Sequence, residues 1–408
     1  MRRTLVLLTA GAALGAGVVA AGVPGSAGAR PATKSTVRTL APGVVLKRIV
    51  IAGPTRVFVL QLTPATGLSL RTVLAGPMGD FHPTSQIAKG RGAFAAINGE
   101  FSVTPGRPMH SFVAGGDLAL LGRAGAAFGF SSDLRHKTVL QARPVVSVLN
   151  VATKTSFTIS DFNSGDPTGH DVVAYTTYGT SGGYRPPSDA CSARLGAPSK
   201  LHWGSTSQVG VYRTWVVQTV ACQHDPIGVQ PGTMVLSAGL NGAGAYSIQQ
   251  LAKDTKVRVS WSLGRKGLDQ TIAGMPQIVT NGVDTAPPQS CGTYFCSANA
   301  RTAVGVTAKG AILLVVVDGH QSSWSQGLTL WQLGHEMIAL GARNAVNLDG
   351  SGAATMWIKG LGVINRPEDR CQFQPYPACL AGQRPVSNAL LVMRGPTHEL
   401  TPLPYAVP

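Results

Sequence analysis

Short runs of apolar residues dominate the hydrophobic pattern of this chain, and glycine or proline separates most of them. Apolar runs of this length with turn residues between them predict β-strands. Helical spacing of apolar residues is rare by comparison. The predicted strands are 57–62, 93–97, 145–149, 172–175, 209–220, 257–263, 312–317 and 389–392, and the predicted helices are 84–89, 247–253 and 330–340.

The helix at 330–340 has the strongest local signals. Thr329 and Gln332 have the spacing of a capping box at its start, and Gly341 is a suitable stop at its end. Its apolar face consists of Leu330, Leu333, Met337 and Leu340. Many strands with few covering helices predict an α+β protein that is built on a large mixed β-sheet.

The N-terminus is typical of a secretory signal peptide. Arg2 and Arg3 precede an uncharged stretch at 5–23, and Ala27-Gly28-Ala29 offers a small-residue cleavage site. We therefore predict an exported protein whose signal peptide, 1–29, is removed near Ala29 and which then has no transmembrane segment. The alternative is an uncleaved membrane anchor.

The mature chain divides into three predicted parts. Residues 30–41 are small, polar and basic, which predicts a disordered leader. A β-rich N-terminal segment is expected at 42–91, followed by the main domain at 92–395. Within this domain, 145–225 is interpreted as a peripheral lobe.

Six cysteines agree with export, because disulfides form in oxidising compartments. Proximity in sequence favours Cys191–Cys222, Cys291–Cys296 and Cys371–Cys379 as the pairs. The cysteines and histidines lack zinc-site spacing, so neither a metal site nor a cofactor is predicted. An Asp-rich cleft could still hold a divalent cation such as calcium, although no calcium-loop spacing is present.

The charge balance bears on partners. Only 13% of residues are charged, yet the formal net charge is +16, which favours anionic partners. The basic residues are scattered and no nucleic-acid-binding motif occurs, so nucleic acid is not predicted as a partner. An anionic sugar phosphate or cell-wall glycopolymer suits an exported protein better. The sequence gives no oligomeric state.

Two apolar strands end in an Asp-Gly pair, at Asp318 and at Asp349. After Asp349 the chain continues as a small, glycine-rich turn. This pattern predicts buried strands that deliver a carboxylate to their C-terminal ends, the second beside a loop of exposed backbone N–H groups. The alternative is a strand that simply ends in a common turn.

An ordered series of motifs surrounds these strand ends. It comprises 95–101, 106–108, 115–118, 301–306, 312–320, 327–330, 345–356 and 384–392. The series resembles the phosphodiester glycosidase family, with similar order and spacing over about 92–393. The resemblance implies a hydrolase that releases a sugar from a sugar-1-phosphodiester, and we take 92–395 as that domain.

The resemblance also implies which residues share one cleft. A phosphodiester leaving group is an anion, so guanidinium groups and amides should stabilise it, while carboxylates act on the sugar as nucleophile or base. The implied catalytic residues are Asp349, Asp318 and Glu100. The implied substrate or phosphate contacts are Arg301, Arg384, Asn98, Asn347, Asn388, Gly350, Ser351, Thr355, His110 and His320. The three asparagines would hold sugar hydroxyls or orient the carboxylates.

Some positions depart from the family pattern. Ser351 replaces a glycine, Ala353 and Ala354 stand in place of serines, and His320 stands in place of an arginine. The missing serines are the best support for the alternative function, a non-catalytic module that binds anionic cell-wall glycans on the same fold. The two carboxylates and two arginines that remain in motif positions argue against it.

Several motif residues also have simpler interpretations. Asn98-Gly99 is a common hairpin turn pair, Arg384 could form a surface ion pair, and His110 and His320 could be surface histidines. Gly179–Gly183 matches the serine-hydrolase Gly-x-Ser-x-Gly pattern, but the prolines that follow prevent the helix which that motif needs.

Overall fold

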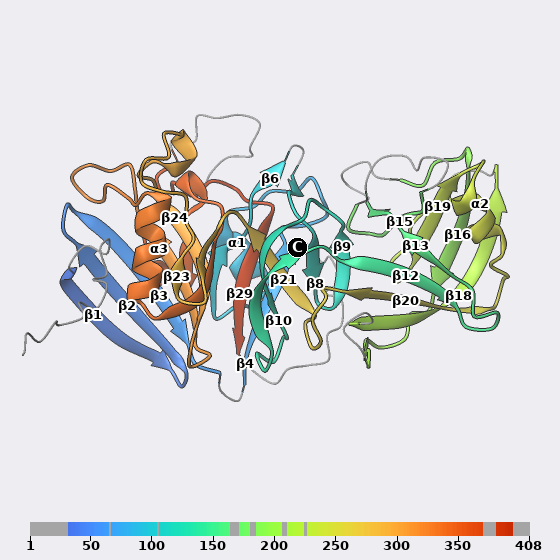
Figure 1. The fold of residues 1–408 in the computed structure, drawn as a ribbon, viewed down its shortest axis with the longest axis horizontal. Coiled ribbons are helices and arrows are strands. Elements are labelled where there is room, and N and C mark those ends of the chain that lie inside the picture. The colour runs from blue at the N-terminus through green and yellow to red at the C-terminus, as the bar shows by residue number, and fades with distance from the viewer. Residues whose placement is uncertain are drawn as a thin grey trace, which may run out of the picture.

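The computed structural model describes residues 32–64, 67–103, 106–163, 171–179, 185–205, 210–223, 227–369 and 381–394. The predicted signal peptide, the pair Cys371–Cys379 and residues 180–183 of the glycine-rich loop lie outside the described residues. Within this part of the chain strands far exceed helices, so the predicted strand-rich α+β class is confirmed (Figure 1). No helix of the described ranges is long and apolar enough to cross a membrane.

The largest sheet near the N-terminus is antiparallel and has eight strands. Its strands come from both ends of the chain, because the first hairpins pair with strands from beyond residue 276. In spatial order they are β1 (Ala32–Ala41), β2 (Val44–Ile51), β3 (Thr55–Leu62), β25 (Ile312–Val317), β24 (Arg301–Thr307), β26 (Ala342–Asn347), β22 (Gln277–Thr280) and β23 (Val283–Asp284).

Alternate residues of this sheet enter two different cores, as the two-residue period of a strand requires. On β25, Leu314 and Val316 face the central core, whereas Val315 and Val317 face the helix α3 (Leu330–Ala339). This explains why the strand sequence is apolar without alternation. The helix begins with the predicted capping box at Thr329 and Gln332.

Two smaller sheets cover the central core. The five-stranded one is β28 (Gly362–Val363), β27 (Met356–Ile358), β5 (Ala95–Asn98), β29 (Asn388–Arg394) and β4 (Leu68–Leu74), with α1 (Thr84–Gly90) packed on it. The three-stranded one is β11 (Lys137–Ala142), β10 (Gly125–Phe130) and β21 (Gln270–Gly274). Two short ribbons pair β6 (Ser102–Val103) with β7 (Arg107–Pro108), and β8 (Phe112–Ala114) with β9 (Asp117–Leu120).

A nine-stranded sheet forms a lobe at one end of the molecule (Figure 1), and its apolar core extends into the β8–β9 ribbon and the three-stranded sheet. It contains β13 (Ser156–Ile159), β12 (Val145–Asn150), β20 (Lys256–Ser262), β18 (Val211–Cys222), β16 (Ala190–Gly196), β19 (Met234–Gly239), β15 (Val173–Tyr175) and β14 (Asp161–Phe162), with β17 (His202–Trp203) beside β18. The helix α2 (Ala243–Gln249) packs on β16 and β19, and Cys191–Cys222 joins β16 to β18 as predicted. The sheet continues to Ser262, well beyond the predicted end of the lobe at 225.

Three sequence predictions need correction. The disordered leader is wrong from Ala32 onward, because β1 pairs along its length with β2 through backbone hydrogen bonds that composition does not reveal. The division at residue 91 cuts across the sheets, since β2 and β3 pair with the later strands. The helix expected at 247–253 begins four residues earlier, where small residues such as Ala245 make up the buried face that periodicity missed.

Candidate active site at two strand ends

The eight-stranded sheet brings Asp318 and Asp349 to the same edge. The strands β25 and β26 flank β24 and both run antiparallel to it, so their C-terminal ends lie on one side. Each carboxylate residue is followed by a glycine and then by a residue in the left-handed region, His320 at φ 51° and Ser351 at φ 52°. The two turns therefore share one backbone pattern.

Both glycines of these turns are required by close packing against Ala300, which precedes β24. A β-carbon on Gly319 would lie 2.1 Å from the Ala300 nitrogen, and one on Gly350 would lie 2.6 Å from the Ala300 carbonyl oxygen. Neither contact can be relieved by moving a side chain, because the opposing atoms are backbone. The Asp-Gly pairs are thus part of the site's architecture as well as turn residues.

Asp349 is the more accessible of the two carboxylates, with its side chain 18% exposed. The Arg384 Nη2 lies 3.2 Å from both of its oxygens and also donates to the Gly350 carbonyl oxygen at 2.9 Å. Burial raises the pKa of Asp349, and the positive charge of Arg384 opposes that shift. A carboxylate beside a guanidinium at a partly open edge is suited to chemistry on an anionic substrate.

Glu368 belongs to the same cluster, and the sequence interpretation missed it. Its Oε1 lies 3.1 Å from the His320 Nδ1. Burial raises the pKa of Glu368, the charges of His320 and Arg384 lower it, and the charge of Asp318 raises it further. Arg384 is therefore close enough to act on both Glu368 and Asp349. The only sequence signal was an acidic pair, Glu368-Asp369, in a chain with 18 acidic residues.

Asp318 has a different environment, because protein N–H groups surround it. It accepts hydrogen bonds from Trp324 Nε1 at 2.8 Å, Asn365 Nδ2 at 3.0 Å and the Arg366 backbone at 2.9 Å. The residue is 1% exposed, and burial raises its pKa while these hydrogen bonds lower it. Arg56 stacks on Trp324 with its Cζ 3.7 Å from the ring centroid. These contacts hold the segments around Trp324 and Arg366 against the C-terminal end of β25.

The predicted asparagines lie beneath the carboxylates and are buried. Asn98 Nδ2 donates to the Asp349 carbonyl oxygen at 2.7 Å, and its Oδ1 accepts from Thr302 Oγ1 at 2.7 Å. Asn388 Oδ1 accepts from the Glu100 backbone N–H at 2.8 Å. Asn347 donates to the Met275 carbonyl oxygen. For Asn98 and Asn388, these contacts favour the predicted role of orienting the carboxylate residues, through their backbones, over binding of sugar hydroxyls, whereas the contact of Asn347 bears on neither role.

Glu100 and His110 form a buried pair next to this layer. Glu100 Oε2 lies 2.7 Å from His110 Nδ1, and both residues are at most 5% exposed. Burial raises the pKa of Glu100, whereas His110 lowers it through a hydrogen bond and its charge. The hypothesis that His110 is a surface histidine is therefore wrong.

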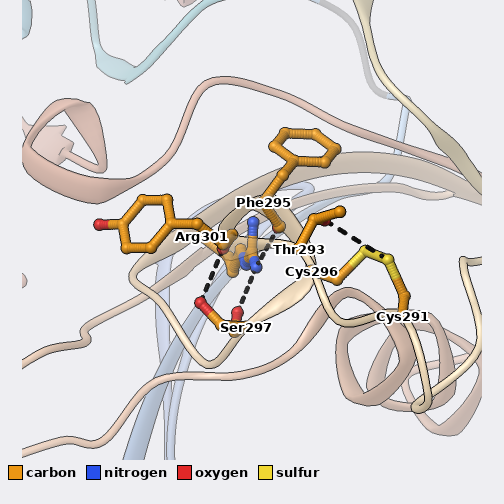
Figure 2. The surroundings of a disulfide bond; sticks show 7 residues. Cys291, Thr293, Phe295, Cys296, Ser297 and Arg301 are labelled. Carbon is orange, nitrogen blue, oxygen red and sulfur yellow. Dashed lines mark hydrogen bonds between the residues drawn. A yellow bond between two sulfur atoms is a disulfide. The ribbon is translucent and has the colours of Figure 1, made fainter.

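The Arg301 guanidinium anchors a loop through backbone carbonyl oxygens (Figure 2). Its Nε donates to the Leu328 carbonyl oxygen at 3.0 Å, and its Nη2 donates to the carbonyl oxygens of Phe295 and Ser297. The predicted Cys291–Cys296 disulfide closes the same loop. Burial lowers the pKa of Arg301 to about 10. These contacts do not favour the predicted phosphate role for Arg301.

The turn after Asp349 does not present the loop of exposed amides that the sequence predicts. The Gly350 N–H donates to Asp349 Oδ1, the Ser351 N–H donates to the Ala300 carbonyl oxygen, and the amides of Ala353 and Ala354 also bond within the protein. The prediction is wrong for these four amides, because the turn folds back on itself as a short 3₁₀ helix, η2 (Ser351–Ala353). Thr355 is fully buried.

The two alanines that stand in place of serines are also buried. Ala353 packs with Trp357 in one apolar cluster, and Ala354 packs in the central core. Among the described residues, no group of three or more His, Cys, Asp or Glu side chains is arranged to hold a metal ion.

Comparisons with known proteins agree with this architecture. Residues 210–393 match the family model described as phosphodiester glycosidase, which confirms the predicted resemblance for that part of the chain. The matched region contains β24 to β26, Asp318, Asp349, Glu368 and Arg384.

Individual relatives are distant. The chain is 31% identical over 115 residues to the N-acetylglucosamine-1-phosphodiester alpha-N-acetylglucosaminidase of Bos taurus, covering 25% of this chain and 21% of that protein. For the Homo sapiens protein of the same name, identity is 30% over 115 residues, covering 25% and 22%. The chain thus matches about a fifth of the length of these relatives. A hypothetical protein from Synechocystis shares the fold, with a TM-score of 0.60, 18% identity, and coverage of 89% of this chain and 64% of that one.

Proposed function

We propose that this protein is a secreted phosphodiester glycosidase that releases a sugar from a sugar-1-phosphodiester. The observation that carries the proposal is the pairing of the Asp349 carboxylate with the Arg384 guanidinium at a partly exposed strand end. A glycosyl phosphodiester needs a carboxylate on the sugar side and positive charge on the leaving-group side. Asp349 supplies the carboxylate and Arg384 supplies the positive charge, with 3.2 Å between Arg384 Nη2 and Asp349 Oδ2.

Each member of the cluster has a distinct role in this proposal. Asp349 attacks the anomeric carbon as its bond to the phosphate oxygen breaks, and water then hydrolyses the glycosyl ester and restores the carboxylate. Arg384 stabilises the departing phosphate, which is already an anion and needs little protonation. Glu368, facing the partly exposed His320, takes up the proton of the attacking water, because a carboxyl group with a raised pKa titrates closer to neutral pH than an ordinary one.

The asparagine layer supports these roles through the backbone. The hydrogen bond from Asn98 to the Asp349 carbonyl, and the one between the Asp349 N–H and the Gly99 carbonyl oxygen, join the eight-stranded and five-stranded sheets at the site. A reacting carboxylate that two sheets hold needs little reorganisation during the reaction.

Secretion and a cell-wall substrate are also proposals. The two disulfides are compatible with an extracellular or lumenal protein, and the net charge of +16 favours anionic glycopolymers. Expression with the intact N-terminus, followed by mass measurement of the protein in the medium, tests export and cleavage near Ala29.

The deciding assay uses pure protein and the methyl phosphodiester of N-acetylglucosamine-1-phosphate, with the released sugar as readout. We expect release by wild type and by Asp254→Asn, a control at an exposed carboxylate in the lobe, but not by Asp349→Asn. A panel of other sugar-1-phosphodiesters extends the assay. Binding of anionic glycans without release from any of them would instead support the non-catalytic module.

A further inference from the structure

A cavity of about 120 Å³ lies where the lobe meets the short ribbon β8–β9, on a different sheet from Asp349. We call it the lobe cavity. It is lined by residues of β9 and by residues of β18, β19 and β20 of the nine-stranded sheet. Five of its lining residues are aromatic, in a chain with only 6% aromatic residues: Phe162, Tyr178, Tyr212, Trp215 and Trp261.

A charged pair crosses this junction and lines the same cavity. Arg213 on β18 donates from Nε and Nη2 to the two oxygens of Asp117 on β9, at 2.7 and 3.2 Å. Its Nη1 donates to the Ser199 carbonyl oxygen at 3.0 Å. An arginine carries five N–H groups, so each terminal nitrogen keeps a second hydrogen beyond these bonds. Asp117 likewise has oxygen lone pairs beyond the two in use.

We propose that the lobe cavity binds one neutral sugar ring of a glycan, separately from the Asp349 site. The C–H face of a pyranose packs on aromatic rings, whose faces carry partial negative charge. Its hydroxyl groups both donate and accept, and so match the spare donors of Arg213 and the spare acceptors of Asp117. Few, convergent polar groups in an apolar, aromatic wall are typical of small-molecule sites.

The chemistry of the cavity disfavours the two other ligand classes. A wholly apolar ligand would leave a guanidinium and a carboxylate dehydrated and without new partners, which costs free energy. A phosphate would meet an arginine whose charge Asp117 already neutralises, and the carboxylate would repel it. A neutral ligand with one apolar face and several hydroxyls avoids both penalties.

The size of the cavity agrees with one sugar ring. The cavity, at about 120 Å³, is much larger than the space that a single buried water needs. A ring-sized ligand therefore fits it better than one ordered water. The proposal does not rest on the hydrolase activity, because it uses none of the residues at the strand ends.

The test is ligand-observed NMR and calorimetry on the full chain with N-acetylglucosamine, mannose and glucose as probes. Inorganic phosphate and the apolar dye ANS are tested as representatives of the two disfavoured ligand classes, anionic and wholly apolar. We expect at least one monosaccharide to bind with millimolar affinity. Trp215→Leu should weaken binding about tenfold or more, since it removes an aromatic wall of the cavity. Trp203→Leu is the matched control, because Trp203 lies in the same lobe, 48% exposed, and does not line the cavity.

Two further variants keep the result decisive. Arg213→Lys removes the two-pronged contact with Asp117 while keeping the charge, and it should weaken sugar binding. It provides an independent test if Trp215→Leu disturbs the fold. Near-ultraviolet circular dichroism of each variant will show whether the fold is intact. Binding to the lobe cavity should persist in Asp349→Asn protein and should there show the same dependence on Trp215 and Arg213. The proposal is overturned if no monosaccharide binds, if only ANS or phosphate binds, or if Asp349→Asn abolishes binding that Trp215→Leu and Arg213→Lys leave intact.

Discussion

The C-terminal ends of β25 and β26 share one sequence pattern but lie in different environments. Each strand is apolar, each leads into Asp-Gly, and each turn packs its glycine against Ala300 with the next residue in the left-handed region. Yet Asp318 is buried and accepts from protein donors, whereas Asp349 is half-buried and faces Arg384. One strand end is closed by its own loops, and the other remains partly open.

This difference teaches that the position of a carboxylate in a sheet does not decide its role. A carboxylate whose oxygens are occupied by fixed N–H groups stabilises the loops that donate to it, and a substrate would have to displace those donors. A carboxylate paired with one guanidinium at an accessible edge can exchange that contact for a substrate. We therefore expect Asp349 to matter for turnover and Asp318 to matter for stability.

The largest expected effect is the loss of turnover in Asp349→Asn. The change is nearly isosteric and removes the charge, so the rate of sugar release should fall about 10³-fold or more, in the range of a lost acid–base or nucleophilic group. The melting temperature should change little, because Asn can still accept from the Gly350 N–H. If the variant turns over substrate as fast as wild type, Asp349 is only a turn residue, and the proposed contrast between Asp349 and Asp318 is wrong.

Asp318→Asn should show the opposite behaviour. The new amide nitrogen would face an N–H donor, such as Trp324 Nε1 or the Arg366 backbone, and a buried donor without an acceptor is destabilising. We expect the free energy of unfolding to fall by about 2–4 kcal/mol, while turnover per folded molecule stays within about tenfold of wild type. Denaturant titration and active-site-normalised rates separate the two quantities. A thousandfold rate loss in stable protein would place Asp318 in the chemistry.

The two arginines provide a parallel contrast. Arg384→Lys keeps the charge and loses the planar fork, so turnover of the phosphodiester should fall about 10–100-fold. Arg301→Lys should lower the melting temperature, since the guanidinium holds three carbonyl oxygens, and should leave specific activity near wild type. Melting curves and rates measured side by side on both variants decide the matter. The reverse outcome would assign the phosphate to Arg301.

The smallest effect concerns the pH profile. As a base, Glu368 must lose its proton, so activity should rise with pH through its raised pKa. Glu368→Gln should remove this acid limb from the pH profile. His320→Asn removes a charge that lowers the pKa of Glu368, so the acid limb should move to higher pH. Identical profiles in wild type and both variants would exclude Glu368 from proton transfer.

The sequence predicted much of the fold because its signals are local. Apolar runs and turn residues located β3, β5, β12, β18, β20, β25 and β29 closely, and the capping box at Thr329 located α3. Proximity in sequence found both disulfides that the structure describes. The first strand was missed because its side chains are exposed and its stability comes from backbone pairing with β2, which leaves no apolar pattern.

By itself the sequence determined which chemical groups stand at the strand ends, since a strand that ends in Asp-Gly places its carboxylate at the sheet edge. Only the tertiary structure decided how those groups differ. Beside the nearby Trp324, Asp318 receives donors from Asn365 and Arg366, more than 40 residues away, and Arg384 approaches Asp349 from 35 residues away. Glu368 joined the site by the same kind of long-range contact. Burial, hydrogen bonding and pKa depend on which distant segments meet, and no local pattern encodes that meeting.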